Sequence, residues 1–159
     1  MDKIECTDKI QELLFNIPLF KDLPSNIKQT LLEKLDCQFF HIGKKEVIAR
    51  QNTPCKYLYV LLEGKLRTDI IDALGNEILI EYIEAPRTFA TPHLFSADCT
   101  LPATFTVLEE GTLLTATKES FFRLFAQEPG ILRNFLRITG NCTHCTVKRL
   151  RMLSYKSIR

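Results

Sequence analysis

The chain has 159 residues, a formal net charge of +2, and 45% hydrophobic and 25% charged residues. These values are typical of one globular domain and exclude a disordered or fibrous protein. No apolar run approaches the roughly 20 residues of a membrane-spanning helix, and the first residues do not form a signal peptide. We therefore expect a cytoplasmic protein without a membrane partner, whose six cysteines are reduced thiols.

Two helices are predicted ahead of the first strand. Thr7 or Asp8 can cap a first helix that ends before Pro18, and Pro24-Ser25 opens a second helix. Apolar residues recur in both with a period near 3.6, which predicts one buried face in each helix. These faces consist of Ile10, Leu13, Leu14 and Ile17, and of Ile27, Leu31, Leu32 and Leu35.

Residues 37–118 carry a different pattern, in which short runs of β-branched and aromatic residues alternate with turn signals every 8–12 residues. The signal Leu74-Gly75-Asn76 lies between residues 66–71 and 78–83 and predicts a hairpin. We expect an α+β protein built on an eight-stranded antiparallel β-roll of the jelly-roll type. The expected turns are at Gly43, Thr53-Pro54, Gly64, Gly75-Asn76, Ala85-Pro86 and Gly111.

Helical periodicity returns near the C-terminus, in a short amphipathic helix over residues 119–126 and a long helix from Ile131 onward. The long helix carries two adjacent seams with the a/d spacing of a coiled coil. One seam is Ile131, Phe135, Ile138, Cys142, Cys145, Arg149 and Met152; the other is Leu132, Leu136, Thr139, Thr143, Thr146, Leu150 and Leu153.

A helix with two seams has two neighbours, which we interpret as its own β-domain and the same helix of a parallel homodimer. The predicted interface is Ile131, Phe135, Ile138, Cys142, Cys145 and Met152, although the pattern leaves open which seam meets the partner. The alternative is that Gly140-Asn141 ends the helix. We therefore expect residues 1–129 to form the main domain and residues 130–159 to form the dimerisation helix. We interpret the basic residues of this helix as a flank that faces solvent.

No catalytic set can be assigned. The three histidines and the paired carboxylates form no recognised nucleophile, base or phosphate-binding motif, so we do not expect an enzyme. Cys142 and Cys145 share a helix face and could hold a metal or an interchain disulfide in a dimer. The competing interpretation is that both are small apolar core residues.

The segment between Pro86 and Phe105 is the predicted ligand pocket, because prolines and a histidine interrupt what would otherwise be strands. The alternative is a connecting loop with a surface histidine. The candidate ligand-binding residues are Phe89, Ala90, Thr91, His93, Leu101, Pro102 and Thr104.

The order of elements, together with the runs 46–51 and 57–66 and the opening Ile17-Pro18-Leu19-Phe20, resembles the sensor domain of the CRP/FNR family of bacterial transcription regulators. The resemblance implies a small-molecule effector and DNA binding through a helix-turn-helix domain. Members that bind cyclic nucleotides carry Gly-Glu and Arg-Ser-Ala where this chain has Ala90-Thr91 and Leu101-Pro102-Ala103. The missing glutamate and arginine argue against a cyclic nucleotide as ligand.

The chain stops at Arg159, where the resemblance implies a hinge, so the sequence is either a shortened version or a natural sensor-only protein. The pocket segment and the ending 152–157 are similar to the HcpR-type branch, whose sensor is associated with haem. That resemblance implies haem as a cofactor, with His93 as the first axial ligand and His144, Met152 or a cysteine as the second. A further possibility is a structural dimerisation domain whose pocket is filled by side chains.

Overall fold

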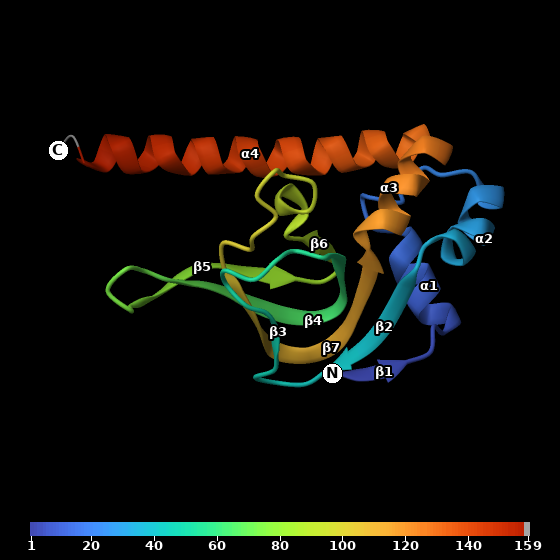
Figure 1. Ribbon diagram of the computed structural model, residues 1–159, viewed down its shortest axis with the longest axis horizontal. Helices are drawn as coiled ribbons and strands as arrows, with labels where there is room; N and C mark the ends of the chain where they lie inside the picture. The colour runs from blue at the N-terminus through green and yellow to red at the C-terminus, as the bar shows by residue number, and fades with distance from the viewer. Residues whose placement is uncertain (158–159) are drawn as a thin grey trace.

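The computed structural model describes the backbone of residues 1–157 and their side chains except those of residues 142–146, 149–150 and 152–157. A β-roll carries three helices at one end, and the longest helix crosses above it (Figure 1). The helices are α1 (Asp8–Phe15), α2 (Ser25–Lys34), α3 (Lys118–Gln127) and α4 (Pro129–Ser157), with a 3-10 turn η1 (Thr91–His93). None of the described helices combines the length and apolar character needed to cross a membrane.

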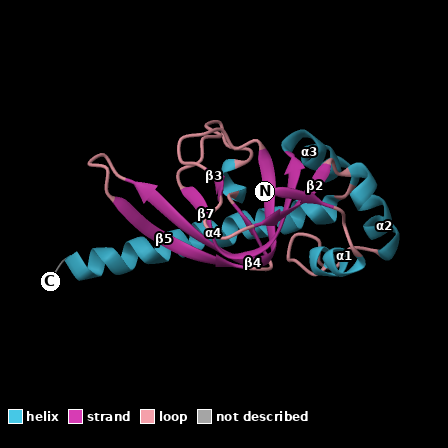
Figure 2. Ribbon diagram, turned by 90° about the horizontal axis from the view of Figure 1, so that it is seen from below, coloured by secondary structure: helices cyan, strands magenta, loops and turns pink. Residues whose placement is uncertain are grey.

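Seven strands form one antiparallel sheet in the described part of the chain, in the order β1-β2-β7-β4-β5, with β3 on β7 and β6 on β4. Figure 2 shows the long strands curving across the molecule and the β4–β5 hairpin projecting from it. The strands are β1 (Asp2–Ile4), β2 (Cys37–Ile42), β3 (Val47–Ala49), β4 (Tyr57–Ile71), β5 (Glu77–Glu84), β6 (Arg87–Phe89) and β7 (Thr104–Thr117).

The count of seven differs from the predicted eight because Gly64 and Gly111 do not end strands, whereas β1, which was not predicted, adds one. Gly64 lies inside β4 and Gly111 inside β7, where the pairing register of the two strands shifts repeatedly. A Cβ on Gly111 would lie 1.8 Å from the carbonyl oxygen of Glu63. The two glycines therefore permit close contact at an irregularity within long strands.

The predicted hairpin and helix starts are confirmed. Residues of β4 and β5 pair from Lys65↔Glu84 to Ile71↔Glu77 around the Gly75 turn. Thr7 caps α1 by accepting a hydrogen bond from the Ile10 amide at 3.3 Å, and α2 begins at Ser25. Helices α1 and α3 pack on the sheet, and the buried core includes Leu14, Leu31, Phe39, Leu58, Leu114 and Phe121.

Helix α4 continues through Gly140, so the alternative ending there does not apply. Its first turns present Ile131 and Phe135 to the chain's own core, where both are buried. Leu132 and Leu136 on the neighbouring seam are exposed, Leu136 to 59%. The assignment of Ile131 and Phe135 to a partner interface is therefore wrong, because their apolar surface is already covered within the chain.

Candidate functional site

The predicted pocket segment borders a cavity of about 340 Å³, here called the β6 cavity. It lies between β4, β5, β6, η1 and the start of β7. Apolar groups dominate its wall, as they do in small-molecule sites, and its volume is at the lower end of the roughly 300–1,000 Å³ found for such sites. Its lining includes Thr68, Ile70, Ile80, Glu81, Arg87, Pro92, Ala103 and Phe105.

Five of the seven predicted ligand-binding residues line this cavity: Phe89, Ala90, Thr91, His93 and Pro102. Leu101 does not, because its side chain is 1% exposed and belongs to the core. Thr104 instead accepts a hydrogen bond from the Gln51 amide to its Oγ1 at 3.0 Å. The sequence pattern identified the segment but could not separate residues that face the cavity from those that support it.

An ion pair at the cavity wall was not predicted. Arg87 on β6 and Glu81 on β5 lie 3.3 Å apart, and their side chains are 39% and 28% exposed. The pair spans the predicted turn at Ala85-Pro86, so opposite charges six residues apart across a turn are the signal that could have revealed it. A guanidinium thus reaches this cavity from a position different from the one that the family resemblance implies.

Thr68 places a polar atom in the same wall, directly across the β4–β5 pair from Glu81. The residue is 4% exposed, and no group in the described part of the chain pairs with its Oγ1. A buried hydroxyl without a partner is costly unless something else bonds to it. A ligand that reached this hydroxyl would supply the hydrogen bond that it lacks.

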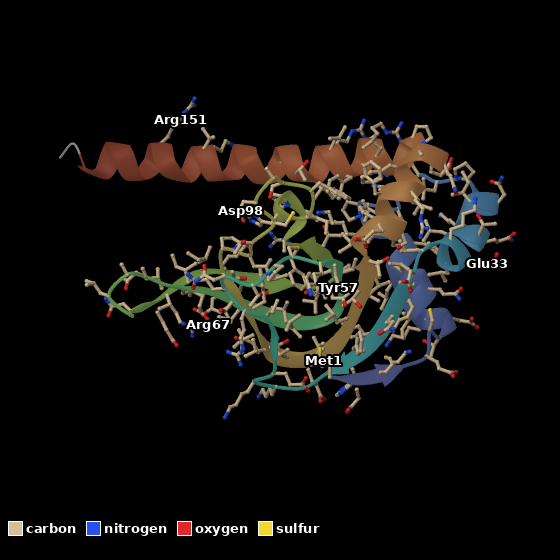
Figure 3. The ribbon with its side chains drawn as sticks, in the orientation of Figure 1. Met1, Glu33, Tyr57, Arg67, Asp98 and Arg151 are labelled. Carbon is tan, nitrogen blue, oxygen red and sulfur yellow. The ribbon has the colours of Figure 1, made fainter. Side chains whose placement is uncertain are left out.

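His93 is half-buried on η1. Burial lowers the pKa of His93 below its ordinary value of 6.5, and the nearby Asp98 carboxylate opposes this in part. The ring is consequently uncharged near neutral pH. Figure 3 labels Asp98 on the loop that lies between the roll and α4.

An aromatic stack separates the β6 cavity from a second cavity of about 320 Å³, here called the β2 cavity. The Tyr59 ring stacks on Phe89 with centroids 5.2 Å apart, and Phe89 lies 5.0 Å from Phe105. Tyr59 lines the β2 cavity, whereas Phe89 and Phe105 line the β6 cavity. Burial raises the pKa of Tyr59 to about 12.

The cavity wall continues directly into a contact with α4. Phe95 follows η1, and its ring lies 5.6 Å from that of Phe135 on α4 and 6.4 Å from that of Phe121 on α3. Helix α4 also contacts η1 itself. A displacement of η1 would therefore press on the first turns of α4.

The remaining predicted residues of the long helix divide into two groups. Ile138 is half-buried and packs against the core. The side chains of Cys142, His144, Cys145 and Met152 lie outside the described residues, so the metal, disulfide and axial-ligand hypotheses for them stay predictions. Within the described residues, no group of three or more His, Cys, Asp or Glu side chains could hold a metal ion.

The fold is a β-roll with a cavity between its strands, and the family comparison agrees with it. The profile of the cyclic nucleotide-binding domain family matches residues 39–128, more than half of the chain. The chain belongs to this family. A comparison with curated proteins found no match.

Solved structures of transcription regulators share the fold. A Thermotoga maritima transcriptional regulator is 24% identical with a TM-score of 0.69, over 80% of this chain and 97% of that one. The Thermus thermophilus catabolite activator protein is 20% identical with a TM-score of 0.76, over 87% of this chain and 64% of that one. The sensor domain of the Pseudomonas aeruginosa regulator DNR is 21% identical with a TM-score of 0.72, over 87% of this chain and 91% of that one. This chain thus spans just under two thirds of the Thermus protein's length.

Proposed function

We propose that the chain is the effector-sensing and dimerisation part of a CRP/FNR-type transcription regulator that acts in the cytoplasm. It works as a binding module and not as an enzyme, and DNA is bound through a helix-turn-helix domain outside this sequence. The observation that carries the proposal is the shared wall: η1 lines the β6 cavity and also contacts α4. An open cavity in this position favours a sensor over a structural domain with a filled pocket.

The effector is a small organic anion with an apolar body. Arg87 supplies the charge for recognition, and Thr68 supplies a hydroxyl that no described residue uses. The ligand's anionic group takes the place of Glu81 on the guanidinium, a bidentate geometry that arginine favours. The apolar body lies against Ile70, Ile80 and Phe105.

A cyclic nucleotide is disfavoured as this effector. Ala90 and Thr91 offer no carboxylate to a ribose, and residues 101–103 offer no guanidinium to a cyclic phosphate. Arg87 enters from β6 and not from residues 101–103, where the family's arginine stands, so it does not replace the missing arginine.

Signalling requires that the ligand bind one arrangement of α4 better than another. Phe95 is the link, because it joins the segment that lines the cavity to Phe135 on α4. The exposed seam of α4, which begins with Leu132 and Leu136, would pack on the same seam of a second copy. Occupancy of the cavity then alters how the two helices lie against each other.

Calorimetric titration tests this proposal with cyclic AMP, cyclic GMP and a panel of small aliphatic and aromatic carboxylates. We expect saturable heat from at least one carboxylate and none from either cyclic nucleotide. Arg87→Met should abolish the binding, whereas Arg67→Met should retain it. Arg67 is a matched control because it is equally exposed at 39% and also pairs with a carboxylate, that of Asp69. Saturable binding of cyclic AMP would contradict the proposed ligand class.

Haem is the second candidate, favoured by one observation: the uncharged ring of His93 lines the β6 cavity. His93 would be one axial ligand, and among the side chains that the structure describes the cavity wall holds no second histidine, methionine or cysteine. The fit is therefore incomplete. Titration with haemin tests whether the protein binds haem. A Soret band that is lost in His93→Ala would favour haem over an organic anion.

A further inference from the structure

The structure brings Cys55, Cys99 and Lys118 together at a place that the proposed effector site does not use. Cys99 lies in the loop between η1 and β7, Cys55 precedes β4, and Lys118 is the first residue of α3. We call these three residues the Cys99 site.

Cys55 and Cys99 lie directly opposite each other on two short antiparallel segments. The Cys55 amide donates to the Cys99 carbonyl at 2.6 Å, the Leu101 amide donates to the Thr53 carbonyl at 2.8 Å, and Pro54 bridges to Thr100 between them. Directly opposed antiparallel residues have Cα atoms about 4.5–5.5 Å apart and side chains on the same face. That separation lies within the roughly 4.4–6.8 Å that a disulfide requires.

The two thiols occupy different environments. Cys55 is 2% exposed, whereas Cys99 is partly exposed, and its Sγ lies 3.2 Å from the Lys118 ammonium. An adjacent lysine and partial exposure are the surroundings of a reactive cysteine, because the thiolate is the nucleophile. A surface hollow of about 400 Å³ reaches Cys55 and Lys118 from outside.

Cys6 and Cys37 form a contrasting pair. Burial raises the pKa of Cys37 to about 11, and burial also raises the pKa of Cys6, so both thiols keep their protons near neutral pH. No ion pair or hydrogen bond joins a lysine or arginine to either thiol within the described residues. This pair is therefore a matched control inside the same chain.

We propose that Cys99 and Cys55 form a peroxide-reactive thiol pair, in which Cys99 is the attacking thiol and Cys55 the resolving thiol. The Cys99 thiolate attacks one oxygen of hydrogen peroxide, the O–O bond breaks, and the departing hydroxide is protonated to water. The resulting sulfenic acid is then attacked by Cys55, so that an S–S bond forms, the S–O bond breaks and a second water leaves. Two thiols lose two electrons in total, and one peroxide is reduced to two waters.

Oxidation of Cys55 and Cys99 to a disulfide would restrain the loop that carries Cys99. The loop that carries Cys99 runs from Phe95, which contacts α4, to Pro102 and Ala103, which line the β6 cavity. A disulfide to Cys55 would fasten the middle of this loop to the start of β4. The inference does not depend on the proposed effector, since the thiol chemistry occurs whether or not the cavity is filled.

Peptide mass spectrometry after treatment of the full chain with limiting hydrogen peroxide tests the proposal. Trypsin places Cys55 on residues 51–56 and Cys99 on residues 88–118, so an internal disulfide appears as these two peptides joined. In Cys55→Ser the sulfenic acid at Cys99 should persist and react with dimedone. Lys118→Met should slow this labelling several-fold, and Lys118→Arg should largely restore it.

Cys6 and Cys37 should remain unmodified under the same conditions. Circular dichroism and thermal unfolding of each variant establish that it is folded before its rate is compared. The proposal is overturned if the two peptides do not join, if Cys37 is labelled as fast as Cys99, or if a folded Lys118→Met reacts at the wild-type rate.

Discussion

Asn134 on α4 donates from its side-chain amide to the backbone carbonyl of Leu19 at 3.0 Å. The same nitrogen donates to the Lys21 carbonyl at 3.1 Å, and Asn134 is 6% exposed. This buried amide joins the last helix of the chain to the segment between α1 and α2. The beginning of α4 is therefore fixed to the domain by polar as well as apolar contacts.

Replacement of Asn134 tests the strength of this connection. Asn134→Ala leaves two buried carbonyls without their donor, so we expect the free energy of unfolding to fall by about 1–3 kcal/mol. Urea unfolding followed by circular dichroism measures the change. The control is Asn141→Ala, at an exposed position of the same helix, which should lie within about 0.5 kcal/mol of wild type. Equal effects of the two substitutions would contradict this role of Asn134.

The exposed seam of α4 is expected to form the dimer. Leu136→Asp places a charge within that apolar contact, so we expect light scattering to report two chains for wild type and one for the variant. Leu74→Asp is the matched control, because Leu74 is 87% exposed at the tip of the β4–β5 hairpin, away from the seam. A wild-type mass of one chain at micromolar concentration would refute the dimer.

Thr68→Val should make the protein more stable. The substitution removes a buried hydroxyl that no described residue satisfies and keeps the shape of the side chain, so we expect a gain of about 1 kcal/mol in the free energy of unfolding. Effector binding should weaken at the same time. Thr117→Val should instead make the protein less stable. The Thr117 hydroxyl caps α3 by accepting a hydrogen bond from the Ser120 amide, and its loss costs about 0.5–2 kcal/mol. A destabilised Thr68→Val would indicate that the hydroxyl has a partner.

Two glycine substitutions should change the free energy of unfolding in opposite directions. Gly111→Ala drives a Cβ into the Glu63 carbonyl, so we expect a loss of about 3 kcal/mol or more, or failure to fold. Gly140→Ala meets nothing within 4 Å and adds a better helix former to α4, which should gain about 0.5–1 kcal/mol. Thermal unfolding of both variants measures the difference. A stable Gly111→Ala would mean that β4 and β7 can separate at this point.

The titration of His93 should appear in the pH dependence of stability. Because burial lowers its pKa in the folded state, the unfolded chain binds the proton more readily, and stability falls as the pH drops below about 6.5. From about one pH unit above that value the ring is neutral in both states and contributes no slope. The difference in unfolding free energy between wild type and His93→Gln should therefore be constant at the high end of the range pH 5–8 and change as the pH falls. His41→Gln is the exposed control, and equal slopes in wild type and His93→Gln would contradict the expectation.

The sequence predicts the helices and the hairpin correctly because their signals are local. Thr7, Pro24-Ser25 and Gly75-Asn76 each act within a few residues of where they stand. Gly64 and Gly111 were misread as turns, since a glycine required by close contact between two strands looks the same in sequence as a glycine required by a turn.

The site was predicted less completely than the fold. Residues 89–93 were identified because prolines and a histidine are unusual in strands, but Arg87, Glu81 and Thr68 look like ordinary strand residues. The Arg87–Glu81 pair spans a single turn, but its convergence with Thr68 depends on how β5 and β6 fold back on β4, a relationship that spacing does not encode. The two seams of α4 pose the same difficulty, because the sequence does not show that Ile131 and Phe135 are buried while Leu132 and Leu136 are exposed.

The stack of Tyr59 on Phe89 gives the protein an optical reporter of its own. The sequence contains no tryptophan and four tyrosines, of which Tyr59 is buried between the two cavities while Tyr57 and Tyr82 are exposed. With its pKa near 12, Tyr59 keeps its proton in moderately alkaline solution. Ultraviolet absorbance and emission of the unlabelled protein can therefore follow events at the wall of the β6 cavity without an added dye.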